Sequence, residues 1–188
     1  PPIVSNLPFI ARDDASLIEA AKRSGASLPR LFEKAIDAAF TMLGYETRLL
    51  GQGKGRVPDG IVKALDDNYA ILWDGKVRTN GYRIGTDDRT IKEYITTQAR
   101  DQKRNGRLRN IYSVIISSGF SDDYDDLIRS LKMETDVNEV ILMEASALVA
   151  MVDAKLRQPI QITLGPDGLQ RLFTNSGVLT AEMVREEL

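Results

Sequence analysis

Two short apolar segments, separated by a turn-rich tripeptide, constrain the fold of this chain more than any other feature. Residues 61–65 and 69–73 are typical of β-strands, and the tripeptide Asp66-Asp67-Asn68 lies between them. Aspartate and asparagine favour turns because their side chains hydrogen-bond to the nearby backbone. The sequence therefore predicts an antiparallel hairpin with its turn at residues 66–68.

The length of that turn decides which polar side chains meet across the hairpin. A two-residue loop at 66–67 sets Asp59 opposite Asp74, whereas a loop at 67–68 sets Asp59 opposite Lys76. In either register all three side chains point to one face, because residues two apart on a strand share a face. A three-residue loop sets Asp59 against Gly75 and separates the polar groups. The predicted cluster is therefore a test of the register.

The composition narrows the chemistry of such a cluster. The 188 residues include no Cys and no His, which excludes disulfides, zinc fingers, thiol nucleophiles and histidine-based metal sites or triads. Any metal ion must take oxygen ligands, which favours Mg²⁺, with Mn²⁺ as a substitute. Hydrophobic content is 43% and charged content 28%, as in soluble globular proteins, and no apolar run approaches the roughly 20 residues of a membrane helix.

The chain length and the helix break at Gly25-Ala26-Ser27 predict the domain organisation. We assign residues 1–27 to an N-terminal lead-in and helix, and residues 28–188 to one main domain. The chain begins with Pro1-Pro2 rather than Met, which is compatible with a fragment of a longer protein. No signal peptide is visible, and a cytoplasmic location fits the absence of cysteine.

Helical and strand-like patterns alternate along the chain and predict an α/β layer architecture. Residues 1–8 are expected to be irregular, and residues 161–164 are ambiguous. Ser27 is expected to cap one helix and Gly44 to end it. The predicted helices are 13–23, 28–43, 87–103, 122–133, 146–157 and 180–188, and the predicted strands besides the hairpin are 45–50, 111–117 and 139–143.

Asp59, Asp74 and Lys76 are the residue types that metal-assisted phosphodiester hydrolysis needs. Facing carboxylates repel each other, and a bound Mg²⁺ relieves the repulsion. Such an ion can activate water and stabilise charge on phosphorus and on the leaving oxygen. Gly75 can offer its backbone carbonyl as a further ligand, and Lys76 can orient the attacking water. Glu33, on the predicted 28–43 helix, is a fourth catalytic candidate, with a surface glutamate as the alternative interpretation.

Basic residues suggest two DNA-contact regions, although the net charge of −2 and the pI of about 5.3 count against an autonomous tight DNA binder. The first holds Lys54 and Arg56, in or beside a glycine-rich segment whose simpler interpretation is a flexible connection. The second is a cluster whose simpler interpretation is a solvated helix end. Its members are Arg100, Lys103 and Arg104, followed by Arg107 and Arg109.

At these residues the chain resembles the PD-(D/E)xK nucleases, and more narrowly the cleavage domain of FokI-like (type IIS) restriction endonucleases. The Asp59, Asp74 and Lys76 motif is shared with many nucleases. The narrower resemblance rests on further segments and covers roughly residues 30–188. Those segments are Leu43-Gly44-Tyr45, Pro58-Asp59-Gly60, Gly81-Tyr82 with Ile84-Gly85, Tyr94 and Arg100, residues 116–120 with Tyr124 and Leu127, and residues 177–185.

The resemblance implies a restriction-endonuclease-like core, in which a central mixed β-sheet is flanked by α-helices on both faces. It implies that Asp59 and Asp74 bind Mg²⁺, that Lys76 completes the site, and that double-stranded DNA is cut to a 5′-phosphate and a 3′-hydroxyl. It also implies a bacterial-type cytoplasmic protein and a recognition domain or subunit outside this chain.

Cleavage domains of this family pair to cut both strands, which implies a homodimer. Asp87 or Asp88 with Arg89 or Lys92 can form reciprocal salt bridges across a two-fold axis. Exposed pairs contribute only about 0–1 kcal/mol each, so we expect a weak or DNA-dependent dimer.

Three other interpretations stay open. The same fold serves junction resolvases, repair nucleases and modification-dependent nucleases. A non-catalytic pairing subunit can keep the fold, although an intact set of Asp59, Asp74 and Lys76 argues against it. A phospho-receiver domain also uses aspartates and a lysine, but Asp13-Asp14 has no suitable strand before it.

Overall fold

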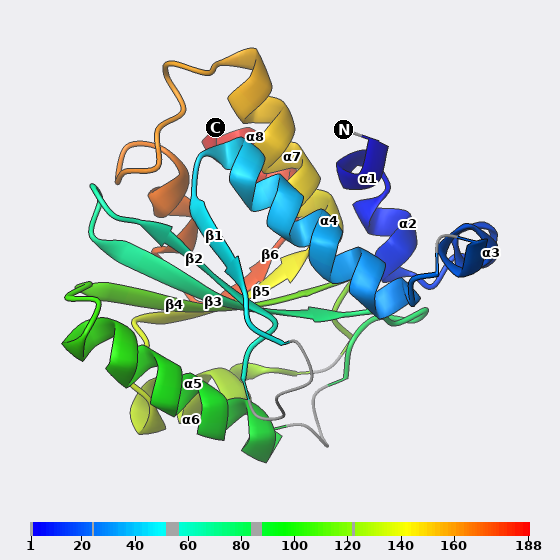
Figure 1. Cartoon of the computed structure of the whole chain (residues 1–188). Coiled ribbons are helices and arrows are strands. Elements are labelled where there is room, and N and C mark those ends of the chain that lie inside the picture. Colours follow the sequence, from blue (N-terminus) through cyan, green and yellow to red (C-terminus); the bar gives the residue numbers. More distant parts are fainter. Residues whose placement is uncertain (1, 24, 52–56, 84–87, 122) are drawn as a thin grey trace.

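One mixed sheet forms the centre of the protein (Figure 1). The computed structural model describes residues 2–23, 25–51, 57–83, 88–121 and 123–188, with the backbone alone for residues 20, 88 and 89. Strands β1 to β3 pair antiparallel, and β3 to β6 pair parallel, in the order β1-β2-β3-β4-β5-β6. The strands are β1 (Glu46–Leu49), β2 (Gly60–Ala64), β3 (Tyr69–Lys76), β4 (Asn110–Ser117), β5 (Glu139–Glu144) and β6 (Gly177–Leu179).

Helices cover both faces of this sheet, which confirms the predicted fold class (Figure 1). Helices α5 (Asp88–Arg104) and α6 (Asp125–Glu134) cover one face. The larger core lies on the other face, beneath α4, α7 and shorter helices. Those elements are α1 (Pro2–Ser5), α2 (Leu7–Ala11), α4 (Leu28–Leu43), α7 (Ala145–Arg157), the 3₁₀ helix η1 (Leu169–Phe173) and α8 (Ala181–Glu187), and α3 (Ala15–Arg23) lies beside α4.

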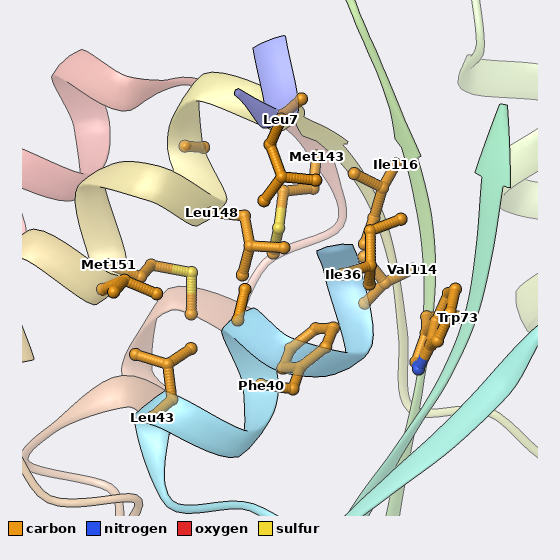
Figure 2. Packing of buried hydrophobic residues seen from close by; sticks show 14 of the residues in the cluster. Leu7, Ile36, Phe40, Leu43, Trp73, Val114, Ile116, Met143, Leu148 and Met151 are labelled. Atoms are coloured by element: carbon orange, nitrogen blue, oxygen red, sulfur yellow. The ribbon is translucent and has the colours of Figure 1, made fainter. Parts of the chain in front are cut away.

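Helix α4 begins and ends where the sequence predicts. The Ser27 hydroxyl accepts a hydrogen bond from the Arg30 N–H, and Gly44 ends the helix in the left-handed region at φ 102°. Figure 2 shows Ile36 and Phe40 of α4 packed towards Trp73, whose ring centroid lies 6.4 Å from that of Phe40. Each fully buried side chain of this kind contributes about 1.5–3 kcal/mol relative to exposure.

The hairpin adopts the first of the predicted registers. Gly60 pairs with Trp73 and Ala64 with Tyr69, which continues to Asp59 opposite Asp74. The loop has four residues, 65–68, rather than two, and it remains centred on residues 66–67. The register is tightly constrained, because a Cβ on Gly60 would lie 2.4 Å from the ring of Trp73.

The expectation that residues 1–8 are irregular is wrong. Helices α1 and α2 bury Val4, Leu7 and Ile10 in the same core as α4. Pro2 and Pro8 lie in the first turns of these helices, where a missing N–H breaks no intrahelical bond. The division of the chain at residue 28 stays a prediction.

The C-terminal region contains elements that the sequence pattern did not predict. Residues 161–164 form no strand, whereas η1 and the three-residue β6 follow them. Both are held by tertiary contacts, since Leu169 and Phe173 are fully buried and β6 pairs with β5. Within the described residues, no helix has the length and apolar character needed to cross a bilayer.

Candidate active site

The predicted polar cluster lies where β3 ends and β2 begins. Along β3, Tyr69, Ile71 and Trp73 pack in the core beneath α4, and Ala70 and Leu72 pack in the core beneath α5. Continuing that alternation, Asp74 and Lys76 point to the α5 face. The Asp59 carboxylate reaches them from the residue before β2.

Asp59 is held to β3 by a hydrogen bond. Its Oδ2 accepts the Gly75 N–H at 2.8 Å, which ties the start of β2 to the end of β3. Gly75 has a packing role as well, because a Cβ there would lie 3.0 Å from Ile36 Cδ1 and 3.1 Å from Phe32 Cδ1. The glycine therefore lets α4 press against β3 directly behind the carboxylates.

Asp74 is the most sheltered charge of the cluster. It is only 5% exposed, and its Oδ2 forms an ion pair with Lys76 Nζ. Lys76 Nζ also lies 5.9 Å from the ring centroid of Tyr82, a buried residue in the loop after β3. The lysine is thus positioned by a carboxylate and an aromatic ring.

Burial and like charge dominate the electrostatics. Burial and, next, the charge of Asp74 together raise the pKa of Asp59 to about 7, against the opposing effect of the Gly75 N–H. Burial also raises the pKa of Tyr94, a residue of α5, and the charge of Asp74 adds to that shift. The two carboxylates are therefore close enough for the charge of Asp74 to disfavour ionisation of Asp59, and a cation between them would relieve the repulsion.

The donor set fits a hard divalent cation. Two carboxylates and the backbone carbonyl of Gly75 are oxygen ligands of the type that Mg²⁺ prefers. Within the described ranges, no three acidic side chains gather closely enough to hold a metal ion. An ion here would thus need backbone or water oxygens besides Asp59 and Asp74.

Glu33 lies at the rim of the cluster. It forms an ion pair with Arg30 on α4, and its charge contributes to the raised pKa of Asp59. The structure therefore places Glu33 near Asp59, with its own charge engaged by Arg30. Its catalytic role stays a prediction.

The second basic cluster lies away from these residues. The C-terminal end of α5 carries Arg100, Lys103 and Arg104. This end lies beside the Tyr69 end of β3, because the Leu108 N–H donates to the Gln102 carbonyl and β4, which follows, begins opposite Tyr69. Lys76 lies at the other end of that strand, roughly 23 Å away at the usual rise per residue. Arg100 also pairs with Asp136 at 3.1 Å. The proposed DNA contacts at these positions stay predictions.

The remaining predicted residues are only partly described. Lys54, Arg56 and Asp87 lie outside the described residues. Asp88 and Arg89 belong to the first turn of α5. Lys92 pairs with Glu134 of the same chain at 3.0 Å, so its charge already has an intramolecular partner.

Sequence reasoning assigned no role in the site to Tyr82, which lies in the loop after β3. The Tyr82 N–H donates a hydrogen bond to the Gly119 carbonyl at 2.8 Å. The Tyr82 carbonyl accepts a hydrogen bond from the Tyr124 hydroxyl at 2.5 Å. These bonds hold the Tyr82 ring beside Lys76. In the sequence, Gly81-Tyr82 and residues 116–120 with Tyr124 both support the family resemblance, but nothing in the sequence indicates that these two segments are in contact.

The mixed sheet and the strand-end aspartates and lysine define a restriction-endonuclease-like fold. The family model of the FokI cleavage domain matches residues 6–179, and the chain belongs to this family. The phospho-receiver interpretation is thereby removed.

Two solved structures have the same fold. The structure of restriction endonuclease FokI aligns with a TM-score of 0.67 and 20% sequence identity, over 94% of this chain and 31% of that one. The structure of FokI bound to DNA gives a TM-score of 0.65 and 20% identity, over 94% and 30%. The chain thus spans less than a third of the FokI chain. No curated protein matches it significantly.

Proposed function

We propose that this domain is a Mg²⁺-dependent DNA endonuclease of the type IIS restriction class, which hydrolyses phosphodiester bonds to a 5′-phosphate and a 3′-hydroxyl. The observation that carries the proposal is the convergence of Asp59, Asp74 and Lys76 on one face at adjacent strand ends. Membership of the FokI cleavage-domain family supports the same activity.

Each residue has a defined task in this mechanism. The carboxylates of Asp59 and Asp74, with the Gly75 carbonyl, would hold Mg²⁺, which when bound activates water and stabilises charge on the phosphate. Lys76 donates hydrogen bonds to the attacking water and to a phosphate oxygen as negative charge develops there. The Gly75 N–H keeps the Asp59 carboxylate oriented, and Tyr82 restricts the position of Lys76.

Target recognition and pairing belong to this proposal too. The chain spans 31% of the FokI chain, which supports delivery to double-stranded DNA by a separate recognition domain or subunit. We infer a weak or DNA-dependent homodimer that brings two such sites to opposite strands. The negative net charge of this chain supports weak DNA affinity when it acts alone.

The test is cleavage of supercoiled plasmid by the 188-residue chain at high protein concentration. Wild type is expected to nick and linearise the plasmid with Mg²⁺, to lose activity in EDTA, and to regain it with Mn²⁺. Lys22→Ala is the matched control, because Lys22 is an exposed lysine of α3 that pairs with Glu19. Cleavage that persists in EDTA, or that survives Lys76→Ala, would refute the proposal.

A further inference from the structure

We propose that Arg78 binds a backbone phosphate of the DNA strand beside the scissile phosphate. This inference rests on the proposed nuclease function and adds a residue that the Asp59, Asp74 and Lys76 motif does not include. Arg78 lies two residues beyond Lys76, where the chain leaves β3.

The backbone of Arg78 is fixed on both sides. Its N–H donates to Ala11 O of α2 at 2.8 Å, and its carbonyl accepts the Ser118 hydroxyl at 2.6 Å. Two segments far apart in the sequence therefore hold this residue against the strand end. A fixed backbone reduces the entropy lost when the side chain binds a ligand.

The guanidinium lies over the same ring as the Lys76 ammonium. Arg78 Cζ and Lys76 Nζ are each 5.9 Å from the ring centroid of Tyr82, which is 1% exposed. The two charges are therefore no more than about 12 Å apart, a distance that a few nucleotides span, because phosphates of one strand rise about 3.4 Å each along the duplex axis. One DNA strand can contact both cations at once.

The charge of Arg78 is available for a ligand. Its side chain is exposed, and among the described residues no carboxylate lies within ion-pairing distance of it. Among the described residues, its guanidinium donates a hydrogen bond from Nη1 to the Val77 carbonyl. Lys76, by contrast, is paired with Asp74, and Arg30 with Glu33.

The surroundings favour such a cation. Asp59 and Asp74 gather negative charge where a polyanion must approach, and Lys76 forms an ion pair with only one of them, Asp74. A guanidinium suits the task, because its planar fork binds phosphate oxygens in pairs while its face stacks on an aromatic ring.

The experiment measures binding of a short fluorescent duplex by anisotropy in EDTA, so that the DNA stays intact, across a range of salt concentrations. Arg78→Ala is expected to weaken binding at low salt about tenfold and to reduce the slope of log K against log salt by about 0.9, the value for one phosphate contact. Arg78→Lys should keep the slope. Arg157→Ala is the matched control, since Arg157 is an exposed arginine that pairs with Asp153 at the far end of α7.

Plasmid cleavage in Mg²⁺ then separates the two proposals. Arg78→Ala should raise KM about tenfold and change kcat little, with the thermal unfolding midpoint unchanged. If wild type cuts and Arg78→Ala matches Arg157→Ala in salt slope and KM, the role of Arg78 is overturned while the nuclease proposal stands. If wild type fails to cut with either metal, the nuclease proposal itself fails.

Discussion

The two ends of strand β3 differ in how their buried polar groups are paired. At the Tyr69 end, the buried hydroxyls of Tyr45 and Tyr69 lie 2.7 Å apart, and Tyr69 donates to the Leu164 carbonyl at 2.8 Å. At the Lys76 end, carboxylates crowd together and the buried hydroxyl of Tyr94 lacks a hydrogen-bond partner among the described residues.

Within the eight residues of β3, one end therefore serves stability and the other end serves function. Burial raises the pKa of Tyr45 and of Tyr69, so both hydroxyls stay neutral, and Tyr45 donates to Tyr69 while Tyr69 donates to the Leu164 carbonyl. Polar groups with partners stabilise a fold, whereas crowded charges destabilise it unless a ligand binds. We therefore expect substitutions at the Tyr69 end to change stability and substitutions at the Lys76 end to change activity.

The largest expected effect is on cleavage. Asp74→Ala and Lys76→Ala should each reduce plasmid cleavage by about 1,000-fold or more, because each removes a group that stabilises the transition state. The circular dichroism spectrum should match that of wild type, so that the loss of cleavage reflects the site and not the fold. Retained cutting by either variant would reject the assignment of these residues.

The second effect is on folding at the opposite end. Tyr69→Phe should destabilise the protein by about 1–3 kcal/mol, because the Leu164 carbonyl loses its donor and the Tyr45 hydroxyl loses its buried partner. Urea unfolding measures this change, and cleavage well below the unfolding midpoint should match wild type. A variant as stable as wild type would remove the contrast between the strand ends.

A smaller effect concerns pH. The pKa of Asp59 rises from 3.8 to about 7 in the folded, metal-free protein, mainly through burial. The folded state then holds this proton more tightly than the unfolded state, so ionisation of Asp59 lowers stability as pH rises from about 4 to 7. Asp59→Asn should therefore raise the unfolding midpoint in EDTA at pH 8 by a few degrees, on the order of 1 kcal/mol.

The same comparison at pH 3.5 is its control. There the carboxyl is mostly protonated in both states, and the two proteins should unfold at closely similar temperatures. An Asp59→Asn midpoint equal to or below that of wild type at pH 8 would show that the Asp59 charge is not strained.

The smallest effect concerns pairing. Lys92→Glu should reduce double-strand cutting more than nicking, by no more than about fivefold, because exposed ion pairs are weak. Glu134→Gln is the matched control, since it removes only the intramolecular partner of Lys92. Equal loss of nicking and double-strand cutting in Lys92→Glu would argue against a pairing role.

The parts of the fold that local chemistry determines were predictable. The hairpin register follows from a turn centred on residues 66–67, and it brought Asp59 to Asp74. The ends of α4 follow from the hydroxyl of Ser27 and the left-handed conformation of Gly44. Both features depend on residues that are close together in the sequence.

The parts that depend on distant contacts were not predictable. Helices α1 and α2 form because Val4 and Leu7 pack on α4, and β6 forms because β5 offers it an edge. Arg78 and Tyr82 lie beside the site because the segment around Gly119 holds their loop. No periodicity in the sequence indicates that contact.

The central claim is that the carboxylates of Asp59 and Asp74 share one divalent cation. Isothermal titration of Mn²⁺ into the metal-free protein at pH 8 tests it most directly, with Asp74→Asn and the remote Asp153→Asn as a matched pair. We expect one Mn²⁺ site in wild type and in Asp153→Asn, with affinity at least about tenfold weaker in Asp74→Asn. Equal Mn²⁺ binding by all three proteins would contradict it.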